Sequence, residues 1–294
     1  MRLLTWGGLC LLFVYGAPAG AQEIDFDRTE AWAMKYFSAI ALMSGYGPPN
    51  RTDPGSVSLG FEAGWVPHLS RAERTVGFDG TNVEDLNKTS VFGRLRVDLA
   101  LPWELHATLG YVPPIELDGA RPDVLSLSIG REIWAGENVR FGLRAHAMGG
   151  DVEGDFTCEE DAVAAGDDPV ANPLGCEEVS RDRMRFDALG LEGGIGFTPW
   201  SASGPEIYAA VSVSRIDPRF QVNARYSGFT DRTVLETEGT LATFSAGLRD
   251  DLAGRWSWAA EAVYAPLTVR RPPEREEEND DILTARTMLT VSWR

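Results

Sequence analysis

Histidine and cysteine are both scarce in this chain of 294 residues, which contains three of each. So small a set of ligands excludes a zinc ribbon or a cysteine cluster, and we expect no metal site and no cofactor. Basic residues are also few, with 27 against 44 acidic residues and a formal net charge of −17. A nucleic-acid-binding protein needs a positively charged face, so this balance argues against nucleic acid as a partner. After residue 22 no run of about 20 apolar residues occurs, which excludes a membrane-spanning helix there.

The first 21 residues have the three parts of a secretory signal peptide. Arg2 supplies the positive charge, residues 9–15 form the apolar stretch, and Ala19-Gly20-Ala21 fits the cleavage site. A short buried helix is the alternative interpretation. Cys10 lies inside the apolar stretch and is expected to leave with it, so the exported chain keeps two cysteines, Cys158 and Cys176.

The remainder of the chain favours an all-β protein, since it is rich in glycine and in aromatic residues. Ten segments alternate apolar and other side chains with a period of two. They lie at residues 57–65, 91–99, 105–111, 125–130, 139–147, 189–197, 207–214, 242–248, 256–264 and 283–293. A tilted strand crosses a bilayer in about 9–11 residues, and these segments suit that length. Alternation by itself is equally typical of a soluble β-sandwich.

Two further patterns favour a membrane barrel over a sandwich. Short connections (101–103, 135–137, 198–204, 250–254) alternate with long ones (67–90, 113–122, 149–185, 266–281), and residues 216–234 suit a hairpin that extends beyond the membrane. Aromatic residues also gather at both strand ends, as they do at headgroup level in barrels. The short-turn ends carry Trp103, Trp134, Trp200, Trp256 and Trp293, and the long-loop ends carry Trp65, Tyr111 and Tyr264.

With these features, residues 57–293 resemble a Gram-negative outer-membrane β-barrel. The last strand, Met288-Leu289-Thr290-Val291-Ser292-Trp293, is similar to the terminal assembly signal of that class, from which Arg294 departs by following the aromatic residue. The resemblance implies a transmembrane antiparallel up-and-down barrel of about ten strands over 57–294. It also implies location in the outer membrane, insertion by the barrel assembly machinery, contact with lipid and lipopolysaccharide, and both termini in the periplasm.

The segment 22–56 differs from the strands, because residues 29–44 are apolar nearly all round and alternate poorly. We predict a short helix there, capped by Asp27 or Thr29 and closed by Gly45. A polar lumen suits such a helix badly. We therefore expect it on the periplasmic side, at the barrel mouth or against the inner leaflet.

The alternation also predicts which side chains face the lumen. The charged or titratable members are Glu62, Arg94, Arg96, Asp98, Glu104, His106, Glu132, Arg140, Arg144, His146, Glu192, Glu261 and Arg286. One interpretation is a salt-bridged plug that fills a narrow lumen, since small barrels are filled by their side chains. The other is a charged constriction that selects solutes.

The two lumen histidines invite a catalytic hypothesis, because a histidine beside carboxylates acts as a general base in many enzymes. Strand position places His106 near the periplasmic end and His146 near the outer end, which predicts that they are too far apart to share a site. We find no hydrolase motif and assign no catalytic residue.

The long acidic connection at 149–185 holds both remaining cysteines. In an oxidising compartment the pair Cys158 and Cys176 predicts a disulfide, with about 3 kcal/mol of stabilisation on the entropic model. The run Asp151-Val152-Glu153-Gly154-Asp155 leaves a calcium site as the alternative, although it lacks the full loop pattern. A second acidic run at 274–281 is either a solvated loop or a bridge through divalent cations to lipopolysaccharide.

These features predict a non-enzymatic outer-membrane barrel that is structural or forms a narrow passive channel. The alternative is a surface binding module that presents the disulfide-closed loop, and an outer-membrane hydrolase is a distant third. The sequence names no solute and no oligomeric state.

Overall fold

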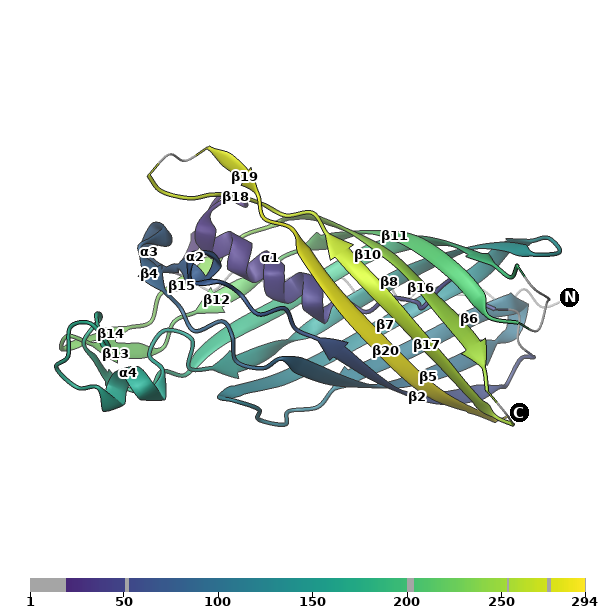
Figure 1. The fold of residues 1–294 in the computed structure, drawn as a ribbon, viewed down its shortest axis with the longest axis horizontal. Helices are drawn as coiled ribbons and strands as arrows, with labels where there is room; N and C mark the ends of the chain where they lie inside the picture. Colours follow the sequence, from purple (N-terminus) through teal and green to yellow (C-terminus); the bar gives the residue numbers. More distant parts are fainter. Residues whose placement is uncertain (1–19, 51–52, 200–203, 253, 274–275, 294) are drawn as a thin grey trace, which may run out of the picture.

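Ten long strands form one antiparallel sheet that closes into a barrel in the computed structural model (Figure 1). The structure describes residues 20–50, 53–199, 204–252, 254–273 and 276–293. Residues 1–19 of the predicted signal peptide therefore lie outside the described residues. The barrel strands are β2 (Val57–Trp65), β5 (Val91–Leu101), β6 (Leu105–Val112), β7 (Ala120–Ala135), β8 (Val139–Gly154), β10 (Asp182–Phe197), β11 (Glu206–Ile216), β16 (Gly239–Asp251), β17 (Trp256–Ala265) and β20 (Ile282–Trp293). Each strand pairs with the next, β8 pairs with β10, and β20 pairs with β2 to close the ring. All ten predicted strands are confirmed.

Apart from one helix and one strand, which precede the first barrel strand, and one 3-10 turn, the remaining elements are short and belong to the long loops. The helices are α1 (Thr29–Ala41), α2 (Arg71–Arg74), α3 (Gly77–Gly80), α4 (Glu160–Ala164) and the 3-10 turn η1 (Pro102–Glu104). The small strands are β1 (Ala21–Glu23), β3 (Thr75–Val76), β4 (Asn82–Val83), β9 (Cys176–Glu178), β12 (Arg219–Gln221), β13 (Ala224–Tyr226), β14 (Phe229–Asp231), β15 (Val234–Glu236), β18 (Thr268–Arg270) and β19 (Glu277–Asn279). Among the described residues, no helix is both long and apolar enough to cross a membrane.

Short turns and long loops lie at opposite ends of the barrel, as predicted. Val57 and Trp293 pair at the short-turn end, where the last strand finishes (Figure 1). At the other end, β12 pairs with β15 and β13 with β14, so the expected extended hairpin is present. β1 joins this hairpin by running parallel to β15.

The outward face of the barrel is apolar in its middle and aromatic at both rims. Leu189 and Leu191 are 67% and 68% exposed, and comparable side chains point outward from every strand of the barrel. Trp103, Trp134, Trp256 and Trp293 are exposed at the short-turn rim, and Trp65 and Tyr264 at the opposite rim; Trp200 lies outside the described residues. An apolar band of this extent between aromatic girdles is the exterior of a barrel that spans a membrane.

The inward face changes character along several strands, from apolar at the long-loop end to charged nearer the short-turn end. On β8 the inward side chains Met148 and Val152 give way to Arg140 and Arg144. On β10, Met184 and Phe186 give way to Glu192. The apolar half therefore forms a hydrophobic core inside the barrel, and α1 fills it.

The predicted helix is confirmed, but its predicted periplasmic position is wrong. α1 lies inside the barrel at the long-loop end (Figure 1). Its side chains donate hydrogen bonds to carbonyls of the long loops, from Thr29 to Val76 (3.1 Å) and from Tyr36 to Pro67 (2.8 Å). The expectation failed because the inner face is apolar at this depth. The cap also differs, since Arg28 precedes the helix and makes no side-chain cap bond.

The acidic loop between β8 and β10 is closed by the predicted disulfide, Cys158 to Cys176. The carboxylates that suggested calcium pair instead with cations: Asp155 lies 2.7 Å from the Lys88 ammonium, and Glu153 lies 2.5 Å from the Arg183 guanidinium. No group of three or more metal-ligating side chains occurs in the part of the chain that the structure describes. Of the second acidic run, residues 276–281 are described, and they include β19, which pairs with β18.

We expect neither Cys158 nor Cys176 to react with an alkylating reagent in the native protein, because each sulfur is bonded to the other. Replacing both with serine should expose the loop to proteases. The barrel should stay folded, because the disulfide joins two residues of the same loop and crosses no barrel strand. Mass spectrometry of alkylated protein and limited proteolysis check both points. Alkylation without prior reduction would contradict the assignment.

A buried carboxyl group in the first long loop should make stability depend on pH. Glu84 is 7% exposed and accepts a hydrogen bond from the Asn82 side chain (3.0 Å). Burial, with the charge of Asp182 nearby, raises the pKa of Glu84 from 4.5 to about 8. A folded-state pKa above the unfolded value means that the folded protein binds the extra proton, so stability falls as pH rises between these values.

The variant Glu84→Gln should remove this fall, because its side chain does not ionise. One group contributes at most about 1.4 kcal/mol per pH unit. Thermal unfolding of both proteins at about pH 5 and about pH 9 measures the difference, with the wild type losing more. Parallel losses in the two proteins would contradict the assignment of the pH dependence to Glu84.

Candidate functional site: an arginine-held plug in the lumen

The chain does not leave the barrel where α1 ends but continues down the lumen to residue 50. We call residues 29–50 the plug. Arg249 of β16 donates to the carbonyls of Tyr46 (3.1 Å) and Pro48 (2.9 Å), and Arg140 of β8 donates to the side chain of Asn50. The plug therefore runs from the long-loop half to the charged half of the barrel.

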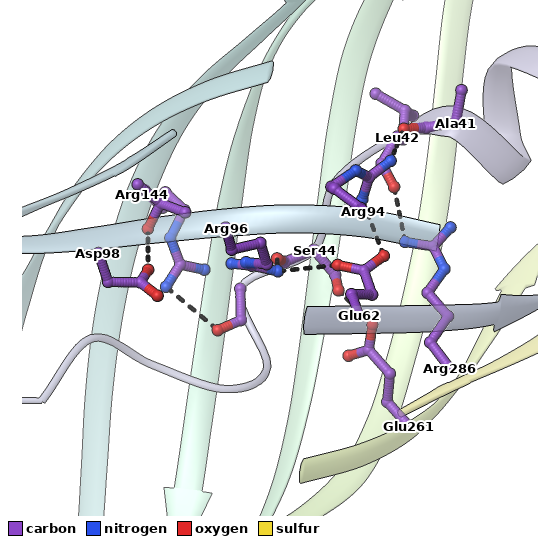
Figure 2. Close-up of polar contacts among 12 residues, drawn as sticks. Ala41, Leu42, Ser44, Glu62, Arg94, Arg96, Asp98, Arg144, Glu261 and Arg286 are labelled. Atoms are coloured by element: carbon purple, nitrogen blue, oxygen red, sulfur yellow. Dashed lines mark hydrogen bonds and ion pairs between the residues drawn. The ribbon is translucent and has the colours of Figure 1, made fainter. Parts of the chain in front are cut away.

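Two arginines cap the C-terminal end of α1 from the barrel wall (Figure 2). Arg286 of β20 donates to the carbonyls of Leu42 (2.6 Å), Ile40 (3.0 Å) and Ala39 (3.2 Å), and Arg94 of β5 donates to the carbonyl of Ala41. The last four carbonyls of a helix have no partner within it, and cations are favoured at that end of its dipole. The two wall arginines supply the hydrogen-bond donors and the positive charge that this end of the helix lacks.

The extended part of the plug is held in the same way. Arg96 donates to the carbonyl of Ser44 (3.0 Å), and Arg144 donates to that of Gly47 (3.4 Å). An extended chain inside a barrel has no strand partner, so each of its carbonyls needs another donor. Arginine, with five donors in a planar fork, suits that need.

Buried carboxylates balance these arginines. Glu62 is fully buried and lies 2.9 Å from Arg94 and 3.2 Å from Arg96 (Figure 2). Glu192 pairs with Arg144, and its second oxygen accepts from the backbone N–H of Gly45 (3.2 Å). Buried ion pairs hold only when further hydrogen bonds satisfy both partners, and here the backbone of the plug provides them.

Two more carboxylates complete the charged layer. Glu206 lies 2.7 Å from Arg249 and also pairs with Arg140. Glu261 accepts hydrogen bonds from the hydroxyls of Ser44 and Tyr208, the latter at 3.2 Å. The plug is thus joined to the wall through carboxylates as well as through arginines.

Glycines on the inner wall make room for the plug. A methyl group at Gly142 would lie 2.6 Å from the Pro49 ring, and one at Gly130 would lie 2.9 Å from it. Real Cβ atoms essentially never come closer than 3.0 Å. At these two positions the wall and the plug are too close together for any side chain larger than glycine. A cavity of about 10 Å³ between Leu42, Glu192 and Arg286 has room for about one water molecule.

The structure places most of the predicted lumen residues on the inner face. Nine are buried there: Glu62, Arg94, Arg96, Glu132, Arg144, His146, Glu192, Glu261 and Arg286. Asp98, His106 and Arg140 are partly exposed. Asp98 accepts from the Thr108 hydroxyl (2.5 Å), and Arg140 contacts Glu132 (3.4 Å).

The prediction for Glu104 is wrong. Its side chain is 40% exposed and pairs with Arg131, which is 52% exposed, at 2.9 Å. Glu104 belongs to the turn η1, where Trp103 and Glu104 both have positive φ angles of 64° and 59°. That conformation breaks the two-residue period, so parity carried from the strand assigned the wrong side.

The prediction that the two histidines lie at opposite ends of the barrel is also wrong. His106 pairs with Gly130 of β7, while His146 pairs with Ser128 of the same strand, so they lie two strands and two positions apart. The estimate failed because the strands of a barrel are staggered and their ends do not share one level. His146 exchanges a hydrogen bond with the Ser214 hydroxyl (2.9 Å).

Sequence reasoning missed Glu206 and Arg249, which hold the lower part of the plug, and it placed Tyr208 on the inward side of a strand without assigning it to the site. Each continues the alternation of a predicted strand: Glu206 precedes Tyr208 by two positions on β11, and Arg249 follows Gly247 on β16. Extending the period by one step would have found Glu206 and Arg249. No sequence signal pairs them with a chain segment about 200 residues away.

Comparison with known proteins gives structural neighbours only. No protein-family model matches the chain, and no curated protein matches it in sequence. Similar solved structures include the outer membrane protease OmpT of Escherichia coli (8% identity, 81% of this chain and 94% of that chain covered, TM-score 0.42). A second is the translocator domain of the autotransporter NalP of Neisseria meningitidis (10% identity, 84% of this chain and 90% of that chain covered, TM-score 0.43). A third is Ail of Yersinia pestis (13% identity, 82% of this chain and 100% of that chain covered, TM-score 0.32).

TM-scores this low support no argument about what this chain does. The barrel assignment rests on the closed sheet described above, and at that level the predicted antiparallel β-barrel architecture is confirmed.

Removing the Arg144 side chain should destabilise the protein strongly. Arg144→Ala leaves Glu192 buried without its ion-pair partner, which costs about 3–5 kcal/mol, and it releases the plug at Gly47. Arg215→Ala is the matched control, because Arg215 is 72% exposed and pairs with Glu238 near the long loops. Thermal midpoints of both variants decide the matter: the first should fall well below the control, and equal midpoints would contradict the network.

Proposed function

We propose that this protein is a non-enzymatic barrel of the Gram-negative outer membrane, with a structural role and a lumen closed by its own N-terminal segment. The short turns face the periplasm and the long loops face the outside. The observation that carries the proposal is the plug, whose backbone carbonyls accept hydrogen bonds from five wall arginines: Arg94, Arg96, Arg144, Arg249 and Arg286. A solute would have to displace these bonds to pass.

The exterior of the barrel supports the membrane location. Its apolar band suits lipid chains, and its two aromatic girdles suit the headgroup levels on either side. In that setting the partners are outer-membrane lipid, lipopolysaccharide around the outer rim, and the barrel assembly machinery during insertion.

A passive channel is the second candidate, and one observation favours it. The charged half of the lumen contains buried arginines and carboxylates that an empty barrel would present to water. Removal of the plug would therefore leave a polar passage rather than an apolar one. On this hypothesis the protein conducts only when the plug is displaced.

Planar-bilayer recording separates the two candidates. The intact protein should show no discrete openings, because the plug fills the lumen. Deletion of residues 23–50 should produce ion-selective openings, provided that the variant still shows the heat-modifiable mobility of a folded barrel. Openings of the intact protein under the same conditions would overturn the closed-lumen proposal, and a folded but silent deletion variant would overturn the channel candidate.

A further inference from the structure

The lipid-facing wall has a hollow that the plugged lumen does not explain. It has a volume of about 260 Å³ and lies across β6, β7, β8 and β10. Its outward side chains include Ile129, Leu143 and Leu191, which are 45%, 48% and 68% exposed. The hollow is therefore mainly apolar and open to the membrane, although Arg131 and parts of the inward-facing residues Arg144 and Glu192 also line it.

Small residues between large ones create the hollow. Ala145 is paired with Ile129 on one side and with Leu191 on the other, and the next outward position pairs Leu143 with Gly193. Ala145, which carries only a methyl group, thus lines the hollow beside three branched apolar side chains, Ile129, Leu143 and Leu191. A flexible hydrocarbon chain is the ligand that such a surface fits in a bilayer.

An ion pair lies at one edge of the hollow. Arg131 lines the hollow and pairs across the strands with Leu105 and Leu143. Its guanidinium contacts the Glu104 carboxylate at 2.9 Å, and about half of each side chain is exposed. A charge on the lipid face costs about 2–4 kcal/mol at mid-membrane and about 0–1 kcal/mol near the interface.

The ion pair is at the level of the headgroups. Glu104 belongs to the turn η1, in which Trp103 is 80% exposed, and tryptophan marks the interface between headgroups and acyl chains. Because η1 is a short turn, this interface belongs to the periplasmic leaflet in the orientation proposed above. The hollow extends from this ion pair along the apolar wall.

We propose that this hollow is a binding site for a zwitterionic phospholipid of the phosphatidylethanolamine type. The lipid phosphate bonds to Arg131, its ammonium group bonds to Glu104, and one acyl chain occupies the hollow. The occupant follows from charge complementarity, because the ion pair presents one positive and one negative group, as the headgroup does. A purely anionic headgroup would meet repulsion from Glu104. The assignment to the periplasmic leaflet rests on the proposed function; the binding site itself does not.

Native mass spectrometry of the purified barrel tests the proposal, with equal amounts of phosphatidylethanolamine and phosphatidylglycerol offered in detergent. The wild type should retain phosphatidylethanolamine preferentially. Arg131→Gln should weaken that retention about tenfold, the scale of one charge-assisted hydrogen bond. Glu104→Gln should shift the preference toward phosphatidylglycerol, because the repulsion is gone. Ala145→Phe should reduce retention of both lipids by filling the hollow.

Arg215→Gln is the control, since it neutralises another exposed, ion-paired arginine outside the hollow (72% exposed, against 52% for Arg131). Equal retention of the two lipids by the wild type, or equal behaviour of Arg131→Gln and Arg215→Gln, would overturn the proposal. Heat-modifiable mobility shows that each variant is folded.

Bilayer recording of the intact barrel, set beside its lipid selectivity, separates this proposal from the proposed function. A conducting intact barrel that still selects phosphatidylethanolamine would leave the lipid site in place and remove the closed lumen. An intact barrel that shows no openings and no preference between the two lipids would support the closed lumen and overturn the lipid site.

Discussion

The closed lumen depends on one kind of interaction, in which arginine side chains from the barrel wall donate hydrogen bonds to backbone carbonyls of a chain segment inside it. A segment threaded through a barrel has no neighbouring strand, so its carbonyls are buried without partners unless the wall provides donors. Arg286 alone satisfies three carbonyls at the end of α1. Without these bonds the plug would be a buried peptide with unpaired polar groups, which costs more than leaving it in water.

The same interaction explains why the wall carries both charges. A guanidinium that bonds only to carbonyls remains a net charge in a buried place, and carboxylates within reach neutralise it. Glu62 serves Arg94 and Arg96, and Glu206 serves Arg140 and Arg249. Each carboxylate is thus a counter-ion to arginines whose other donors hold the plug or its last residue. In the intact protein the charged layer is therefore part of the closure, and it would line a polar passage only if the plug were displaced.

Much of the barrel was predictable from the sequence, because alternation with a period of two follows directly from strand geometry. The strands, the sides of the loops and the disulfide follow from residues close together in the chain. The errors arose where local parity is interrupted or where distance depends on the whole barrel. Glu104 was misassigned because the positive φ angles of η1 break the period. The separation of His106 and His146 was misjudged because it depends on strand stagger, which no single strand encodes.

The position of α1 needed two sequence features to be considered together. A helix that is apolar nearly all round belongs in a protein core or a membrane, and α1 is buried over most of its length. The strands contain the matching signal, since inward positions such as Met148, Phe186 and Leu241 are apolar at the long-loop ends. A uniformly polar lumen excludes this helix, whereas a lumen that is apolar in one half requires something apolar to fill it. Within the described chain α1 meets that requirement, and its C-terminal carbonyls then lie at the depth where the wall changes to arginine. The gradient along the inner face therefore sets both the depth of the helix and the place where the extended part of the plug begins.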